Sequence, residues 1–215
     1  TMYEHGLGEF FYRNEIDFQG LINFPVTTDK EKPVHEYTNT PVTTRLLVPI
    51  GGGKDSIVTM ELLKKAGYDI TLLRVGQNNI TDQMAKIAGL PIMNITRKLS
   101  PELFKLNADG ALNGHIPITG YLSFLSIVLA ILTDKTDVVW SNEASANIGN
   151  VEFHGQQINH QWSKGLEFEI VFALGVYARS PSSQNFIKCQ EQQKLMIMDL
   201  ENEYHRKLLK KKDEE

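Results

Sequence analysis

Cysteine is nearly absent from this chain: its 215 residues include one, Cys189. A lone cysteine forms no internal disulfide, and no cysteine–histidine cluster has the spacing of a zinc site. A surplus of positive charge is also missing, because 22 basic and 26 acidic side chains give a formal net charge of −4. Without a general positive field, no nucleic-acid partner is expected.

Long uninterrupted apolar runs are absent too. The most apolar stretch, residues 116–132, is shorter than the ~20 residues of a membrane helix and contains Pro117 and Gly120. It is therefore predicted to be a buried helix. The first residues show no basic segment followed by an apolar one, so no signal peptide is expected. We predict a cytoplasmic protein that does not contact the membrane.

The centre of the chain alternates apolar runs with segments of helical spacing. Strands are predicted at 45–50, 69–75, 90–95 and 137–140, and helices at 55–66, 81–88, from Ser100 onward, and at 116–132. Strands that alternate with helices pair in parallel through right-handed crossovers. This pattern predicts an α/β fold with a doubly wound, mostly parallel sheet, whose ligand lies at the carboxyl ends of the strands.

Two flanking segments complete the predicted organisation around the α/β domain at 45–179. Alternating apolar residues between 10 and 24 predict two short strands around a turn at 13–15, so 1–44 is predicted as a β segment with a polar connector. Residues 180–215 are rich in Gln, Lys and Glu and are predicted to form a linker and a charged helical tail.

A glycine-rich loop, Gly-Gly-Gly-Lys-Asp-Ser at 51–56, separates the first strand of this domain from its helix. Consecutive glycines let the backbone approach an anion, and the N–H groups and dipole of the following helix favour negative charge. Lys54 adds a positive charge and Ser56 a hydroxyl donor. Asp55 would repel a phosphate, so it is expected either to hold Mg²⁺ or to cap the helix.

The loop is neither a Walker A loop nor a Gly-x-Gly-x-x-Gly fingerprint. It resembles the Ser-Gly-Gly-x-Asp-Ser pyrophosphate loop of the ATP pyrophosphatases, the PP-loop family with the adenine nucleotide alpha hydrolase-like fold, although Gly51 stands where many members have Ser. The resemblance implies that ATP is cleaved between its α and β phosphates, releasing AMP and pyrophosphate. The alternative is a structural turn capped by Asp55.

Three further segments are unusually polar for their positions. They read Asn-Gly-His-Ile-Pro at 113–117, Ser-Asn-Glu-Ala-Ser-Ala-Asn-Ile-Gly-Asn at 141–150 and Ile-Asn-His-Gln-Trp-Ser-Lys at 158–164. Together with the loop they resemble, in four blocks between residues 6 and 169, the UDP-N-acetylmuramoyl-L-alanyl-L-glutamate epimerases. Members of that bacterial PP-loop family are longer, so the resemblance implies a compact or truncated member.

The resemblance implies ATP and Mg²⁺ as cofactors and a UDP-N-acetylmuramoyl dipeptide, a peptidoglycan precursor, as the small-molecule substrate. Conversion of the terminal L-glutamate carboxylate into an acyl-adenylate removes its negative charge. A base can then take the α-proton, and reprotonation from the opposite face gives D-glutamate. Racemases that work without ATP commonly use two thiols, so the lone Cys189 agrees with activation by ATP.

The site residues follow from the same resemblance. The implied ATP-binding residues are Gly51, Gly52, Gly53, Lys54, Asp55, Ser56, Asn142 and Glu143, with Asp55 also the Mg²⁺ ligand. The side chains of His115, His160 and Lys164 are predicted to serve as base, acid and partners of the substrate carboxylates, with no assignment among the three.

Each assignment has a structural alternative. His115 can cap the following helix, His160 and Lys164 can share one exposed helical face because they lie four residues apart, and Glu143 can be a capping carboxylate. Trp140 is predicted to lie in the core.

Two other functions stay open for the whole chain. One is a different PP-loop enzyme, either an amidotransferase-type ligase or a tRNA sulfur-transfer enzyme. Sulfur transfer usually brings paired cysteines or a basic RNA-binding face, and the chain has neither. The other is an ATP-binding fragment without catalytic activity. The sequence indicates no oligomeric state.

Overall fold

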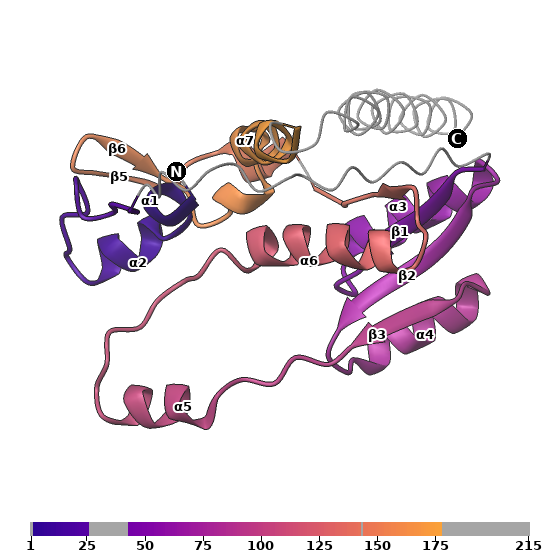
Figure 1. The fold of residues 1–215 in the computed structure, drawn as a ribbon, viewed down its shortest axis with the longest axis horizontal. Helices are drawn as coiled ribbons and strands as arrows, with labels where there is room; N and C mark the ends of the chain where they lie inside the picture. The colour runs from indigo at the N-terminus through magenta and orange to yellow at the C-terminus, as the bar shows by residue number, and fades with distance from the viewer. Residues whose placement is uncertain (1, 26–42, 143, 178–215) are drawn as a thin grey trace, which may run out of the picture.

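A four-stranded parallel sheet forms the centre of the protein. The computed structural model describes residues 2–25, 43–142 and 144–177. The strands are β1 (Arg45–Pro49), β2 (Asp69–Val75), β3 (Ile92–Ile95) and β4 (Asp137–Val138), in the order β3-β2-β1-β4, and every pairing is parallel (Figure 1). All four predicted strands are present, and the predicted parallel α/β fold is confirmed.

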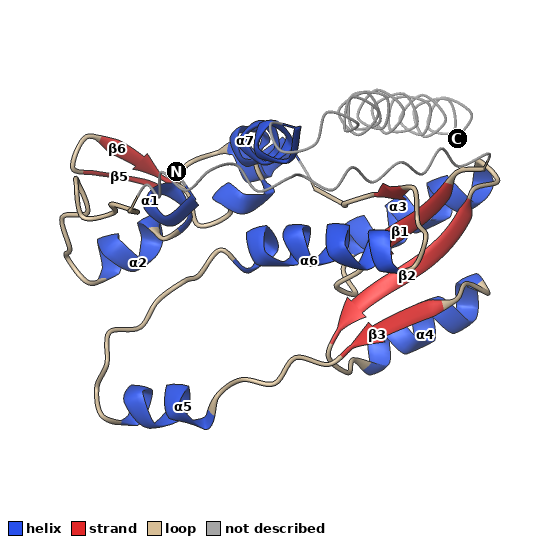
Figure 2. Ribbon diagram, viewed as in Figure 1, coloured by secondary structure: helices blue, strands red, loops and turns tan. Residues whose placement is uncertain are grey.

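Helices cover both faces of this sheet (Figure 2). Helices α3 (Lys54–Lys65) and α4 (Asn79–Ala88) pack on one face, and α6 (Ile118–Leu132) packs on the other. Side chains alternate between the faces of a strand. Leu46 and Val48 of β1 therefore join the core shared with α3 and α4, whereas Leu47 packs with Ala130 of α6. The sheet is doubly wound, as predicted.

Replacing Leu47 by alanine should lower the free energy of unfolding by about 2–5 kcal/mol, because a fully buried leucine leaves a cavity in a close-packed core. Urea unfolding followed by circular dichroism measures the change. The matched control is Ile87→Ala on α4, where the side chain is 85% exposed and the expected loss is within about 0.5 kcal/mol. Equal losses in the two variants would contradict this assignment of the core.

The helix boundaries follow local signals. The Asn78 side chain accepts a hydrogen bond from the Ile80 N–H at the start of α4, and Gly89 ends that helix in the left-handed conformation. Ser100 caps α5 (Pro101–Ala108), as the Ser-Pro-Glu sequence predicts. Helix α6 begins two residues later than predicted because Pro117 occupies its N-cap position.

The predicted N-terminal β segment is wrong. Residues Met2–Gly6 form helix α1 and Gly8–Arg13 form helix α2, although the turn predicted at 13–15 is present. Leu7 and Phe11 lie four residues apart, which is a helical spacing, and both pack in the same apolar cluster. The alternation of aromatic residues in this segment obscured the helical period in the sequence.

A β-hairpin that the sequence analysis missed follows the sheet. Strands β5 (Val151–Phe153) and β6 (Gln156–Ile158) pair antiparallel, and His154 and Gly155 turn between them with φ of 49° and 72°. Two successive positive φ values match the primed turns that suit two-residue hairpins. Ile158 at the end of β6 packs with Phe11 and Phe18, so the hairpin and the N-terminal segment share one core.

Trp162 anchors the segment after the hairpin. It lies in the 3₁₀ helix η2 (Trp162–Lys164), is 5% exposed, and packs with Phe168 of helix α7 (Leu166–Tyr177). Its indole N–H donates to Glu167 Oε2 at 2.8 Å. A second 3₁₀ helix, η1 (Ala144–Asn147), precedes the hairpin. Helix η2 contacts α6, so the segment after β4 lies against the N-terminal end of α6 (Figure 1).

Some predictions fall outside the described residues. These are most of the polar connector, Glu143, Cys189 and the helical tail at 180–215. Among the helices that the structure describes, none combines the length and apolar character needed to span a bilayer.

Candidate functional site

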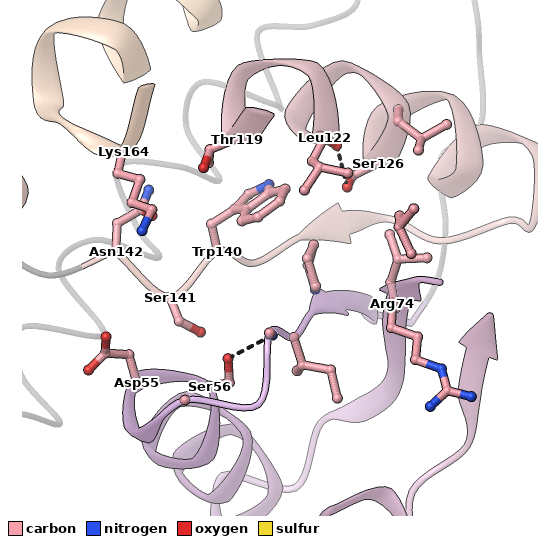
Figure 3. Close-up of a pocket in the computed structure, with 17 residues that line it drawn as sticks. Asp55, Ser56, Arg74, Thr119, Leu122, Ser126, Trp140, Ser141, Asn142 and Lys164 are labelled. Carbon is pink, nitrogen blue, oxygen red and sulfur yellow. Dashed lines mark hydrogen bonds between the residues drawn. The ribbon is translucent and has the colours of Figure 1, made fainter. Parts of the chain in front are cut away.

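A cavity of about 320 Å³ lies at the carboxyl ends of β1, β2 and β4, bordered by the first turn of α3 and one side of α6 (Figure 3). The chain runs outward from β1 to β2 and β3 on one side and then crosses back to place β4 on the other side of β1, which makes this position a topological switch point. Ligands of open parallel α/β sheets bind at such a crevice. The cavity is therefore where the sequence analysis expects a ligand.

The glycine-rich loop forms one wall of this cavity. Gly51 and Gly53 line it, and a Cβ added at either position would meet no other protein atom within 4 Å. Gly52 has a φ of +90°, a conformation that side chains disfavour. The Gly51 N–H donates to Ser56 Oγ at 3.2 Å, which fixes the loop against the first turn of α3 (Figure 3). The open space over the two glycines suits close approach of an anion to the backbone.

Asp55 does not cap α3. The N-cap residue is Gly53, with no hydrogen bond from a capping side chain, and Asp55 lies in the first turn and lines the cavity. The uncapped end of α3 thus faces the cavity with the positive end of its dipole. Of the two roles predicted for Asp55, capping is wrong and Mg²⁺ binding stays a prediction. Gly52 and Lys54 belong to the loop but do not line the cavity.

Ser141 is a cavity residue that the sequence analysis did not select. Its Oγ is buried and has no hydrogen-bond partner, and Ser141 lines the cavity from the segment that follows β4 (Figure 3). A buried hydroxyl without a partner costs desolvation free energy. The one sequence feature that could have pointed to Ser141 as a cavity residue is its position near the carboxyl end of the fourth predicted strand. A ligand group in the cavity would supply the missing hydrogen bond.

Ser141→Ala should leave the free energy of unfolding unchanged or raise it by up to about 1 kcal/mol, since the unpartnered hydroxyl gains nothing from burial. The same change should weaken binding of a phosphate-bearing ligand about tenfold. The matched control is Ser126→Ala. Ser126 lines the same cavity, but its Oγ already donates a hydrogen bond to the Leu122 carbonyl at 2.7 Å. A clear loss of stability in Ser141→Ala, measured by urea unfolding, would contradict this account.

Asn142 and Lys164 line the same cavity as the loop. The Asn142 amide donates to Glu169 Oε1 of α7 at 3.2 Å, which holds that side chain in place. Lys164 ends η2 and is exposed. Trp140, predicted as a core residue, also lines the cavity. Residues after β4 and residues of the glycine-rich loop are thus brought together, as the sequence analysis expects.

His115 and His160 form a pair that does not line this cavity. Their ring centroids lie 6.1 Å apart, and the ring planes are nearly perpendicular at 87°. His115 does not cap α6, whose N-cap residue is Pro117. His160 and Lys164 share no helical face, because His160 lies in a turn before η2. The structural alternatives for these residues are therefore wrong.

The loop that carries His115 is fixed by the N-terminal segment. The Asn14 side-chain amide donates to the Asn113 carbonyl at 3.1 Å. Gly114 lies so close to α2 that a Cβ there would stand 3.0 Å from Phe10 Cα. Helix α2 and its C-cap residue Asn14 therefore hold the loop that carries His115, a role of this segment that the sequence analysis did not foresee.

The donor set around the cavity limits how a metal could bind. No group of three or more His, Cys, Asp or Glu side chains comes together among the residues that the structure describes. A cation held through Asp55 would need its other ligands from a bound phosphate and water. Mg²⁺ is commonly bound in that way, through one or two carboxylates and substrate phosphates.

The fold and the cavity define an α/β protein with a glycine-rich loop at the switch point of a parallel sheet. The chain belongs to the MurL N-terminal domain family, whose model matches residues 1–186. This family membership confirms the resemblance on which the sequence analysis relied.

Curated relatives of the chain bear one name, UDP-N-acetyl-alpha-D-muramoyl-L-alanyl-L-glutamate epimerase. The protein from Xanthomonas oryzae pv. oryzae (strain MAFF 311018) is 44% identical over 172 residues, which cover 80% of this chain and 38% of the relative. The protein from Micromonospora sp. (strain ATCC 39149 / NRRL 15099 / SCC 1413) is 40% identical over 169 residues, or 79% of this chain and 37% of the relative. The chain thus spans less than two-fifths of the length of these relatives.

Among solved structures, the NMN synthetase from Francisella tularensis matches 49% of this chain and 48% of its own, with a TM-score of 0.37 and 14% sequence identity. A similarity of that extent carries no argument about function.

Proposed function

We propose that this chain binds ATP at the cavity and takes part in ATP-dependent epimerisation of the terminal glutamate of UDP-N-acetylmuramoyl-L-alanyl-L-glutamate. The reaction activates the L-glutamate carboxylate as an acyl-adenylate with release of pyrophosphate, inverts the α-carbon, and then hydrolyses the adenylate with water to give D-glutamate and AMP. The observation that carries the proposal is the glycine-rich loop at the switch point, with open space over Gly51 and Gly53. The names of the relatives supply the substrate and the reaction type.

The residues present fit a bound triphosphate. The loop N–H groups and the end of α3 favour negative charge, and Ser141 offers a buried hydroxyl that lacks a protein partner. Lys164 lies on the cavity opposite the loop residues and can reach a phosphate or a carboxylate. Asp55 can hold Mg²⁺ beside the phosphates. With these partners, the loop would bind the departing pyrophosphate.

Activation by ATP suits the chemistry of glutamate. An ionised carboxylate resists loss of the neighbouring α-proton because the product would carry a second negative charge. Adenylation removes the first charge and makes the carbonyl able to accept the electron pair. ATP supplies this activation; the protein supplies the proton transfers, which positioned acids and bases accelerate by about 10²–10⁴-fold.

The structure divides the three predicted catalytic residues into two groups, and we assign their roles accordingly. Lys164, on the cavity with the loop, binds the carboxylate that is activated or a phosphate of ATP. His115 and His160, paired 6.1 Å apart, are the proton-transfer groups on the two faces of the α-carbon. An imidazole is suited to this role because it gains and loses a proton near neutral pH.

The test is incubation of the chain with ATP, Mg²⁺ and the substrate in D₂O. The proposal predicts that recovered glutamate contains the D-isomer and carries deuterium at the α-carbon. Omission of ATP should abolish both signals. Recovery of only unlabelled L-glutamate from the complete mixture would contradict the proposal.

A further inference from the structure

Asn150, in the loop before β5, contacts His160 twice. Its Oδ1 accepts a hydrogen bond from the backbone N–H of His160 at 3.1 Å and lies within hydrogen-bond distance of ring atom Nδ1. The backbone N–H of Asn150 donates to the Ile158 carbonyl at 2.7 Å, which extends the β5–β6 ladder. The hairpin therefore fixes the position of the Asn150 side chain relative to His160.

These two contacts determine which ring nitrogen carries the proton. A backbone N–H can only donate, so the Asn150 atom that faces it must be the carbonyl oxygen and not the amide nitrogen. The same oxygen faces Nδ1 of the ring. Nδ1 must therefore be the donor, and in the neutral ring Nε2 keeps its lone pair.

We infer that Asn150 is a positioning residue that holds His160 in the Nδ1–H tautomer, so that Nε2 is the atom that exchanges a proton with the substrate α-carbon. The inference rests on the proposed function, in which His160 is one of the two proton-transfer groups. The second ring, His115, lies nearly perpendicular to His160 and leaves the contact with Asn150 in place.

The proton transfer balances at named atoms. When His160 acts as base, the α-carbon–hydrogen bond breaks and its electron pair moves toward the activated carbonyl as an enolate. The proton forms a bond with Nε2, and the resulting imidazolium still donates Nδ1–H to Asn150. The opposite face of the α-carbon receives its proton from the protonated ring of His115.

The first test is the ring ¹⁵N spectrum of His160 in the chain labelled at histidine, recorded at about pH 9, where a typical histidine is neutral. The inference predicts a protonated Nδ1 and an unprotonated Nε2 in the unaltered chain. Asn150→Ala should shift the ring toward the other tautomer, whereas Asn150→Asp keeps an acceptor oxygen and should retain the first. A protonated Nε2 in the unaltered chain would overturn the inference, even if the variants fail to fold.

The matched control is Asn159→Ala. Asn159 also holds this loop, because its Oδ1 accepts from the Gln161 N–H at 2.8 Å and its amide donates to the Ala146 carbonyl at 2.7 Å. Both contacts are to backbone groups, so loss of the Asn159 side chain should leave the tautomer of His160 unchanged. A tautomer shift as large as that in Asn150→Ala would show that general loosening of the loop causes it.

The second test is exchange of the substrate α-proton with solvent deuterium. Asn150→Ala should lower kcat at least about tenfold with little change in KM, because a wrong tautomer can cost up to ~10⁴ in rate. Asn150→Asp should restore most of the rate. If His160→Ala abolishes exchange while Asn150→Ala does not, the inference fails and the proposed function stands. If His160→Ala leaves exchange intact, the role of His160 in the proposed function fails, whatever the tautomer.

Discussion

Replacing Gly53 by valine should lower the affinity for ATP about 100-fold while leaving the fold intact. The fold should tolerate the change because an added Cβ meets no other protein atom within 4 Å, and φ −86°, ψ 173° is extended backbone that valine adopts readily. Binding should suffer because the new side chain occupies the space between the loop N–H groups and the phosphates. Loss of one or two hydrogen bonds to a charged group, at about 1.5–3 kcal/mol each, gives the expected magnitude.

Titration calorimetry with ATP and Mg²⁺ measures this affinity, and thermal unfolding checks the fold. Gly53→Ala should give a smaller loss than Gly53→Val, since its side chain fills less of the space. The control is Gly110→Ala, where a methyl group also enters open space but far from the loop in sequence. Gly110→Ala should lose some stability, because Gly110 has a φ of +86°. Its affinity for ATP should be unchanged. Unchanged affinity in Gly53→Val would exclude the loop as the phosphate site.

His160→Ala should reduce the rate of epimerisation by about 10²–10⁴-fold, the usual contribution of one positioned acid or base. ATP affinity should change little, because His160 does not line the cavity beside the loop. Chiral analysis of recovered glutamate measures the rate, and calorimetry measures ATP binding. The two readouts separate proton transfer from nucleotide binding.

The control for this variant is His154→Ala. His154 is six residues earlier, is exposed in the hairpin turn, and has no assigned role. Its loss should leave the rate within about twofold of the unaltered chain. Equal losses in both variants would mean that the region is merely sensitive to substitution, and unchanged epimerisation in His160→Ala would remove that residue from the proton transfer.

The central α/β domain could be predicted from the sequence because its local signals agree. Each buried strand reads as an apolar run, and caps such as Ser100 and Gly89 mark the ends of helices. The position of the cavity followed from the parallel topology alone, since the glycine-rich loop follows β1 and Asn142 lies in the segment that follows β4.

The N-terminal segment and the hairpin could not be predicted in the same way. Helix α2 is six residues long, too short for its period to stand out from the alternation of its aromatic residues. Its helical form depends on packing against Ile158, which lies far away in the sequence. The pairing of His115 with His160 depends on the same long-range packing, because Gly114 contacts Phe10 of α2.

The measurement that tests the account most directly is a quenched incubation of the chain with ATP and Mg²⁺, with and without UDP-N-acetylmuramoyl-L-alanyl-L-glutamate, followed by separation of the nucleotides. The account predicts AMP and pyrophosphate in equal amounts, formed only when the substrate is present. Formation of ADP, or the absence of AMP from the complete mixture, would contradict it.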